Sequence, residues 1–212
     1  MKPWRMHRRE CGGTLHLNSE LLFRKYGLEC VRGQARVLEI GPDAFPSTYQ
    51  AIAGDSASEW HTIDLYESRQ LTYRGLSEYS FPIPDERYDI VLSGQVVEHV
   101  RKPWLWMKEL ARVCRVGGKA ITINPVSWPY HEAPVDCWRA YPEGMKAVYE
   151  DAGLKVLLST AESLEPGHFR RYIPGRSQTE LRPGLRAAYA VLGVFGFPVE
   201  RAVDTITIGE RV

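Results

Sequence analysis

Short apolar runs alternate with longer segments of helical periodicity along this chain. The apolar runs have the length of buried strands and are bounded by turn or charged residues; they cover 36–40, 60–64, 88–92, 120–123, 154–158 and 204–208. Apolar residues at helical spacing cover 103–116 and 142–152, and each of these segments opens on a proline and is followed by glycine. This alternation predicts an α/β fold built on a mostly parallel sheet.

Polar residues and glycines follow several of the predicted strands. The first strand ends in Glu39 and is followed by Gly41, the second ends in Asp64, and Gln95 follows the strand at 88–92. The ligand crevice of a parallel sheet lies beyond the carboxyl ends of its strands, where an acidic residue on the second strand can bind the hydroxyls of a ribose. The pattern suggests an adenosine-containing cofactor, although a strand-ending Asp64 is also typical of a helix N-cap.

The turn after the first strand reads Gly-Pro-Asp-Ala-Phe-Pro over residues 41–46. It lacks the Gly-x-Gly-x-x-Gly turn that lets a backbone approach a pyrophosphate, which argues against a nicotinamide-dependent oxidoreductase. Gly41 still allows close approach of a ligand. Asp43 is interpreted either as a partner for a positively charged ligand group or as a cap of the next helix.

Charge and cysteine content exclude several classes. Lys and Arg number 27 against 26 Asp and Glu, so no overall attraction to nucleic acid is encoded. Four widely separated cysteines predict reduced thiols and no metal site. No signal-like apolar region follows the first residues, and the apolar run 187–199 is shorter than the ~20 residues of a membrane span. We expect a cytoplasmic protein without a transmembrane segment.

The segment 80–125 resembles class I S-adenosylmethionine-dependent methyltransferases of the small-molecule type. Its matching motifs are Pro82 to Asp89, Glu98-His99-Val100 and Gly117-Gly118, in the order found in that family. The likeness extends over roughly residues 35–158. It implies a Rossmann-like three-layer domain, with a seven-stranded, mostly parallel sheet whose last strand is antiparallel, and S-adenosyl-L-methionine as the cofactor.

The resemblance also assigns roles to single residues. It implies that Glu39 and Gly41 lie beside the methionine portion of the cofactor, with Gln95 near them. The ribose and adenine would then be contacted by Asp64, Leu65, Ser77 and Glu78. Two features depart from the family: Asp43 and Phe45 stand at its later glycine positions, and Ser77 replaces an adenine-side Asp. Because S-adenosylmethionine has no pyrophosphate, the altered turn is compatible with a variant site.

The segment 124–145 is rich in proline, aromatic and polar residues and predicts an acceptor pocket. Its pattern is similar to a subgroup of methyltransferases associated with polysaccharide and natural-product sugar biosynthesis; it consists of His131, Pro134, Asp136, Trp138 and Arg139. We interpret His131 as a general base oriented by Asp136, with Trp138 and Arg139 contacting the acceptor. The alternative is that these residues only brace the loop.

The chain is expected to form one domain over residues 1–212. An N-terminal helical cap covers 1–31, with Asn18 or Ser19 capping a helix; the cofactor-binding core covers 35–158, and an inserted lid or interface segment covers 159–200. The apolar residues of that insertion would pack on the core, on a second copy in a homodimer, or on a lipid-like acceptor.

The predicted function is transfer of a methyl group from S-adenosylmethionine, at oxygen, to a small-molecule or glycan-linked acceptor. Two alternatives remain: a catalytically silent methyltransferase-like binding subunit and, more remotely, a nicotinamide-dependent oxidoreductase.

Overall fold

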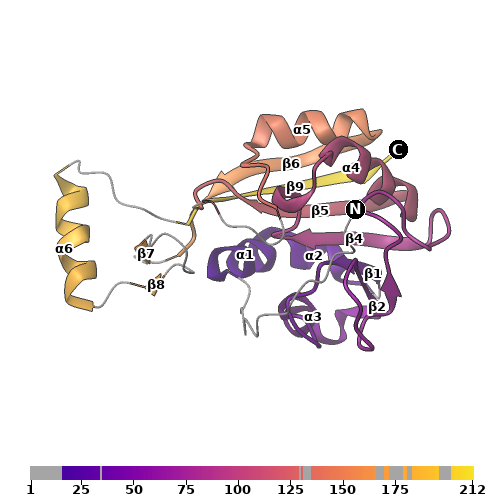
Figure 1. The fold of residues 1–212 in the computed structure, drawn as a ribbon, viewed down its shortest axis with the longest axis horizontal. Helices are drawn as coiled ribbons and strands as arrows, with labels where there is room; N and C mark the ends of the chain where they lie inside the picture. Colours follow the sequence, from indigo (N-terminus) through magenta and orange to yellow (C-terminus); the bar gives the residue numbers. More distant parts are fainter. Residues whose placement is uncertain are drawn as a thin grey trace, which may run out of the picture.

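A seven-stranded sheet forms the centre of the molecule, which we describe from a computed structural model (Figure 1). The structure describes residues 16–33, 35–128, 130, 135–165, 170–171, 179–180, 183–195 and 202–212. The strand order is β3-β2-β1-β4-β5-β9-β6. The strands are β1 (Ala35–Ile40), β2 (Ala57–Asp64), β3 (Tyr73–Arg74), β4 (Tyr88–Gly94), β5 (Cys114–Pro125), β6 (Leu154–Glu162) and β9 (Asp204–Arg211).

The pairing directions confirm the predicted fold class. The first five strands in this order, β3, β2, β1, β4 and β5, are parallel. In contrast, β9 runs antiparallel to both of its neighbours, β5 and β6. Parallel neighbours bring their carboxyl ends to one edge of the sheet, so the residues that follow β1, β2, β4 and β5 are close in space. The site residues predicted at the ends of these strands therefore lie where a ligand crevice is expected.

Helices cover both faces of the sheet (Figure 1). On one face lie α4 (Pro103–Val113) and α5 (Pro142–Asp151), and the apolar sides of both helices pack in one buried cluster. On the other face, a second cluster is covered by α1 (Leu17–Leu22), the π-helical turn η1 (Phe23–Gly27), α2 (Leu28–Val31) and α3 (Thr48–Ala53). Two short 3₁₀ turns are η2 (Gly54–Ser56), which follows α3, and η3 (Val97–His99), whose Val97 belongs to the first cluster.

Two local predictions were wrong. The helix predicted over 103–116 ends at Val113, because Cys114 is already extended and pairs with Tyr88 in the β4–β5 ladder. Asn18 and Ser19 do not cap a helix. Because α1 begins at Leu17, both residues belong to the helix itself, and both are buried. Their hydrogen bonds run to distant parts of the chain, as described below.

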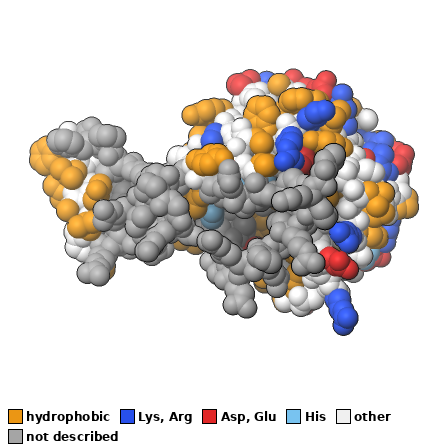
Figure 2. Space-filling view, in the orientation of Figure 1, with side chains coloured by type: hydrophobic (Ala, Val, Ile, Leu, Met, Phe, Trp, Pro, Cys, Tyr) orange, Lys and Arg blue, Asp and Glu red, His pale blue; other side chains and the backbone are white. Residues whose placement is uncertain are grey.

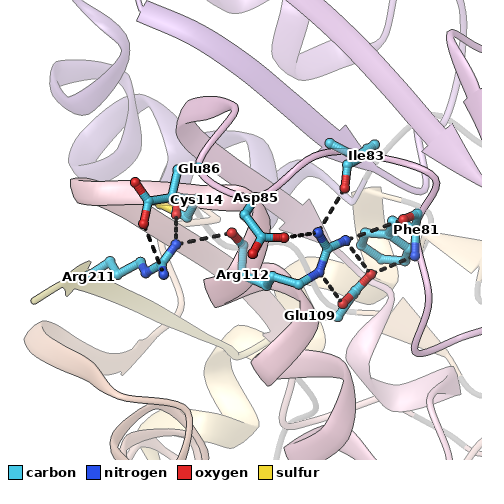
Figure 3. A network of polar contacts seen from close by, with 8 residues as sticks. All are labelled: Phe81, Ile83, Asp85, Glu86, Glu109, Arg112, Cys114 and Arg211. Carbon is cyan, nitrogen blue, oxygen red and sulfur yellow. Dashed lines mark hydrogen bonds and ion pairs between the residues drawn. The ribbon is translucent and has the colours of Figure 1, made fainter.

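Arg112, near the end of α4, holds the segment that leads into β4 (Figure 3). Its guanidinium binds both carboxylate oxygens of Glu109 at 2.8 Å and donates to Asp85 Oδ1 at 2.5 Å. It also donates to the carbonyls of Ile83 at 2.8 Å and Phe81 at 3.2 Å. These contacts hold the pKa of Arg112 above its usual range, because they stabilise the charged form.

An excursion leaves the sheet after β6 and returns at β9. It contains the short strands β7 (Arg170–Arg171) and β8 (Thr179–Glu180), which pair with each other, and the helix α6 (Pro183–Val194). In Figure 1, α6 stands away from the sheet, at the left. Within the described part of the chain, no helix is long and apolar enough to cross a membrane.

Candidate functional site

Gly41 lies where the ends of β1, β2 and β4 converge. Its amide donates to the carbonyl of Ile63 at 2.9 Å, and its φ of +70° favours glycine. A Cβ at this position would lie 2.5 Å from Val96 Cγ2 and 3.9 Å from Asp64 Oδ2. The turn after β1 therefore needs glycine here, and the structure brings Gly41 and Asp64 together as the sequence predicted.

Glu39, near the end of β1, connects this turn to the neighbouring elements. Its buried Oε2 accepts a hydrogen bond from Trp60 Nε1 at 2.8 Å and another from the hydroxyl of Ser47. Burial raises the pKa of Glu39 to about 7, although the two hydrogen bonds act against that rise, and the charge of Asp43 adds to it. Glu39 thus links β1 to β2 and to the start of α3, which supports a positioning role for its carboxyl group.

Asp43 supports the beginning of α3, whose N-cap residue is Ser47. Its carboxylate accepts from the amide of Thr48 at 2.9 Å and from the Thr48 hydroxyl at 2.6 Å, while Ser47 accepts from the amide of Gln50 at 3.0 Å. Of the two interpretations of Asp43, these contacts favour the helix cap. They also explain how the turn stays ordered with an aspartate at a position where the resembled family has glycine.

Asp64 and the residues expected at the adenine end form a second group. Asp64 Oδ1 accepts from the amide of Leu65 at 2.5 Å, and burial raises the pKa of its carboxyl group. The Leu65 side chain is 43% exposed beside it. A Cβ on Gly75 would lie 3.0 Å from Leu65 Cδ2 and 3.5 Å from the Ser77 carbonyl. Asp64, Leu65 and Ser77 therefore surround Gly75.

Gly75 was missed by the sequence reasoning. Its amide donates to the Asp64 carbonyl at 2.9 Å, directly after β3. The signal was weak, because β3 is only two residues long and Tyr73–Arg74 has no periodicity that marks a strand.

Glu78 forms its contacts with residues other than Asp64, Leu65 and Ser77. Its carboxylate forms an ion pair with Arg101 at 2.7 Å and accepts from the Tyr79 hydroxyl at 2.7 Å. These contacts tie the 77–80 turn to the loop before α4. A contact between Glu78 and an adenosine ribose or base stays a prediction.

Gln95 follows β4 with a left-handed backbone, at φ +57°. Its amide nitrogen Nε2 donates to the Ser19 hydroxyl at 2.6 Å and to Asp204 Oδ1 at 3.0 Å. The side-chain oxygen Oε1 is buried and has no hydrogen-bond partner among the described residues. Because a buried acceptor without a donor is costly, this atom is suited to a donor on a bound ligand.

Glu98 is a site residue that the sequence reasoning did not select. It is fully buried in η3, and its Oε2 has no hydrogen-bond partner within the described part of the chain. Burial raises the pKa of Glu98 to about 8; Asp204 and Asp136 add to the rise, whereas the positive charge of Arg139 opposes it. The available signal was its place in the Glu98-His99-Val100 motif after β4, which had been used only for the family resemblance.

The loop after β5 is tied to this motif. Its contacts include His99 Nδ1 with the Val135 carbonyl at 2.5 Å, and the Cys137 amide donating to the Glu98 carbonyl at 2.7 Å. Trp138 Nε1 donates to the Val100 carbonyl at 2.7 Å. Residues 135–138 therefore lie against the segment that carries Glu98.

Asp136 and Arg139 form a bidentate pair within this loop. The two guanidinium nitrogens lie 2.5 and 2.7 Å from the two carboxylate oxygens of Asp136, and Arg139 Nε donates to the Trp128 carbonyl at 3.0 Å. Trp138 packs edge-on against Trp104, with ring centroids 6.3 Å apart. The contacts of all three predicted loop residues brace the loop, which was the alternative interpretation. His131 and Pro134 lie outside the described residues.

Part of the chain matches known methyltransferases. A model of the methyltransferase-domain family matches residues 46–122. A protein of Mycobacteroides abscessus described as an uncharacterized methyltransferase is 34% identical over 121 residues, covering 51% of this chain and 46% of that protein. One from Mycolicibacterium vanbaalenii is 32% identical over 88 residues, covering 38% and 34%. The chain thus spans less than half of the length of these curated relatives.

Solved structures share the fold. An S-adenosylmethionine-dependent methyltransferase from Archaeoglobus fulgidus superposes with a TM-score of 0.59 at 14% identity, covering 91% of this chain and 92% of that one. A methyltransferase-like protein from Bacillus halodurans gives 0.57 at 14% identity, covering 87% and 98%. Residues 46–122 therefore match the methyltransferase-domain family, and the solved structures, at 14% identity, show that the chain shares the fold of such methyltransferases.

Proposed function

We propose that this protein transfers a methyl group from S-adenosylmethionine to a hydroxyl oxygen of a small-molecule or glycan-linked acceptor. The observation that carries the proposal is the convergence of Gly41 and Asp64 at the ends of β1 and β2, at a turn that lacks the glycines needed beside a pyrophosphate. Such a site suits an adenosine ligand without phosphates.

The donor groups fit this cofactor chemically. S-adenosylmethionine carries an ammonium and a sulfonium cation, and the sulfonium supplies the methyl group. The described site offers buried carboxyl groups on Glu39 and Glu98, and the buried, unpartnered oxygen Oε1 of Gln95. Carboxylates and carbonyl oxygens are the groups that attract cations and accept from an ammonium. Asp64 would hold the ribose hydroxyls, and Leu65, Ser77 and Glu78 would line the adenine.

Methyl transfer to a hydroxyl also requires a proton acceptor. We propose His131 for this role, since a histidine is partly neutral near pH 7 and His131 follows β5 in the sequence. Asp136, Trp138 and Arg139 would shape the acceptor pocket through the braced loop that they form. Glu98 is the competing base, because a carboxyl group with a pKa of about 8 can accept a proton once a cation lies beside it.

Calorimetric titration with S-adenosylhomocysteine tests the cofactor assignment. We expect saturable binding by the protein and none of NADH. NADH binding without S-adenosylhomocysteine binding would instead favour the oxidoreductase alternative. Cofactor binding without turnover on any acceptor would favour the silent-subunit alternative.

A screen of glycans, sugar nucleotides and hydroxylated natural products with methyl-labelled cofactor tests the acceptor class. With an acceptor in hand, His131→Ala is expected to lower kcat by roughly 10²- to 10⁴-fold with cofactor affinity unchanged, as for loss of a general base. Glu98→Gln is the comparison, because it removes the competing base. Full turnover by His131→Ala together with loss of turnover in Glu98→Gln would move the role to Glu98.

A further inference from the structure

The helix α6 exposes apolar side chains to solvent. Every residue of α6 whose burial is described is exposed, except the half-buried Gly193. The exposed large side chains of α6 and the residue after it are Leu185, Tyr189, Val191, Leu192, Val194 and Phe195. Figure 2 shows hydrophobic side chains gathered over this helix at the left end of the molecule. A helix packed on its own core would bury such residues.

The apolar character of α6 surrounds the helix rather than forming one stripe. Leu185, Tyr189 and Leu192 follow one face at helical spacing, whereas Val191 and Val194 lie on another. A helix that is apolar all round is normally enclosed on every side, in a core or in a bilayer, whereas a docked protein partner covers one face. The core of this chain does not enclose α6, and an apolar run of about 10–14 residues is also typical of an interfacial membrane segment. All-round apolar exposure therefore favours a lipid surface over a protein groove.

The length of α6 suits a position in the membrane surface. Its 12 residues extend about 18 Å at 1.5 Å per residue, compared with ~30 Å for the hydrocarbon core of a bilayer. The apolar sequence continues without any charged residue from Ala187 to Val199. An apolar segment of this kind can enter one leaflet but cannot span the bilayer.

The charge around α6 complements an anionic surface. Residues 166–199 contain five arginines and one acidic residue, Glu180, whereas the whole chain is almost balanced, with 27 basic and 26 acidic residues. Of these arginines, Arg182 directly precedes α6 in the sequence and Arg186 lies in its first turn. α6 itself contains no acidic residue. Basic residues beside an apolar helix increase its affinity for anionic lipid headgroups.

We propose that α6 and Phe195 form a peripheral membrane anchor, which inserts at the headgroup–acyl boundary of an anionic bilayer. The anchor is independent of the proposed methyl transfer, because it involves no residue of the cofactor site.

Co-sedimentation with vesicles tests the anchor without cofactor or acceptor. We expect the full chain to bind phosphatidylcholine vesicles that contain about one quarter phosphatidylglycerol, and to bind pure phosphatidylcholine much more weakly. Val191→Asp should lower binding to the anionic vesicles by about tenfold or more, because a carboxylate would enter the apolar boundary. Val116→Asp is the matched control, since Val116 is 54% and Val191 57% exposed, and Val116 lies in the sheet far from α6 in sequence.

Three further measurements make the result decisive. Arg182→Glu/Arg186→Glu should weaken binding to the anionic vesicles and reduce its dependence on salt. Melting temperatures equal to that of the parent protein would show that Val191→Asp and Val116→Asp fold. Failure of the parent protein to bind anionic vesicles, or equal binding by Val191→Asp and Val116→Asp, would overturn the proposal. A dimer in sedimentation that Val191→Asp dissociates, without vesicle binding, would overturn it in favour of self-association.

Discussion

Gln95 Nε2 donates a hydrogen bond to Asp204 Oδ1 at 3.0 Å, which joins the residue after β4 to the first residue of β9. The other oxygen of Asp204 accepts from Asn18 Nδ2 at 2.7 Å, and Gln95 Nε2 also donates to Ser19 at 2.6 Å. The carboxylate of Asp204 is therefore the point at which α1, β4 and β9 meet. Asn18 or Ser19 was expected as a helix cap; instead, both residues hold α1 against the residue after β4 and the start of β9.

Replacing Gln95 by glutamate tests this junction. At pH 7.5 we expect Gln95→Glu to lower the free energy of unfolding by about 1–3 kcal/mol, because a second carboxylate would face Asp204 and two donated hydrogen bonds would be lost. The loss should shrink at pH 5, where one of the two carboxyl groups can hold a proton and donate it. Chemical denaturation at both pH values measures the effect, and Gln70→Glu at an exposed position serves as the control. An equal loss at both pH values would contradict the charge explanation.

Asp64→Ala is expected to weaken binding of S-adenosylhomocysteine by about 1–3 kcal/mol, since it removes the proposed acceptor of the ribose hydroxyls. Asp64→Asn should weaken it less, because its amide oxygen still accepts one hydrogen bond. Isothermal titration calorimetry gives both values, with Asp55→Ala at an exposed position as the matched control. An affinity unchanged in folded Asp64→Ala would remove the ribose assignment.

Glu98 is expected to make stability fall as the pH rises. Its folded-state pKa of about 8 lies above the ordinary value of 4.5, so the folded state favours the protonated form. The stabilising contribution is full below about pH 4.5 and is lost as the pH rises through about 8. Glu98→Gln should therefore be more stable than the parent protein at pH 9, by roughly 1–3 kcal/mol.

Urea denaturation from pH 5 to pH 9 measures this difference. The exposed Glu143→Gln serves as the control, and it should leave the pH dependence unchanged. If Glu98→Gln keeps the slope of the parent protein, the carboxyl group of Glu98 does not titrate in this range.

Arg112→Lys is expected to lower the free energy of unfolding by about 1–3 kcal/mol. One ammonium group cannot replace a guanidinium that binds Glu109 with two nitrogens and also reaches Asp85 and two carbonyls. Arg32→Lys provides a matched control, because its ion pair with Glu29 is exposed and should contribute less than about 1 kcal/mol. Similar losses in the two variants would show that the network in Figure 3 adds no specific stability.

The sequence predicted the sheet well because buried parallel strands have a local signature. The run that ends in Glu39 and Gly41 and the run that ends in Asp64 each carry enough apolar residues to be recognised alone, and chain order then places their ends together. The clustering of Gly41 with Asp64 followed from that order. Helix ends were less certain: Cys114 joins β5 because of its pairing with Tyr88, a non-local contact.

The contacts that the sequence did not predict are long-range polar ones. Asn18 bonds to Asp204 and to the Glu162 carbonyl, and no periodicity in residues 16–31 identifies such partners. Its local preference for a helix cap was overridden by burial against β6 and β9. Glu98 was overlooked for a similar reason, since its raised pKa depends on burial by segments that are distant in sequence.

The pairing of Glu162 with Asp204 has a consequence for how this fold can vary. The excursion between β6 and β9 leaves the sheet at Glu162 and re-enters it at Asp204, and these two residues pair with each other. The connection is therefore equivalent to a hairpin loop, and the sheet does not fix its length. Because the entropy of closing a loop changes only slowly with its length, segments can be gained or lost there at little cost to the core. The exchangeable segment thus begins and ends at the same edge of the sheet as the candidate site, where Asp204 contacts Gln95, so a change in it can alter the surroundings of the site without rebuilding the sheet.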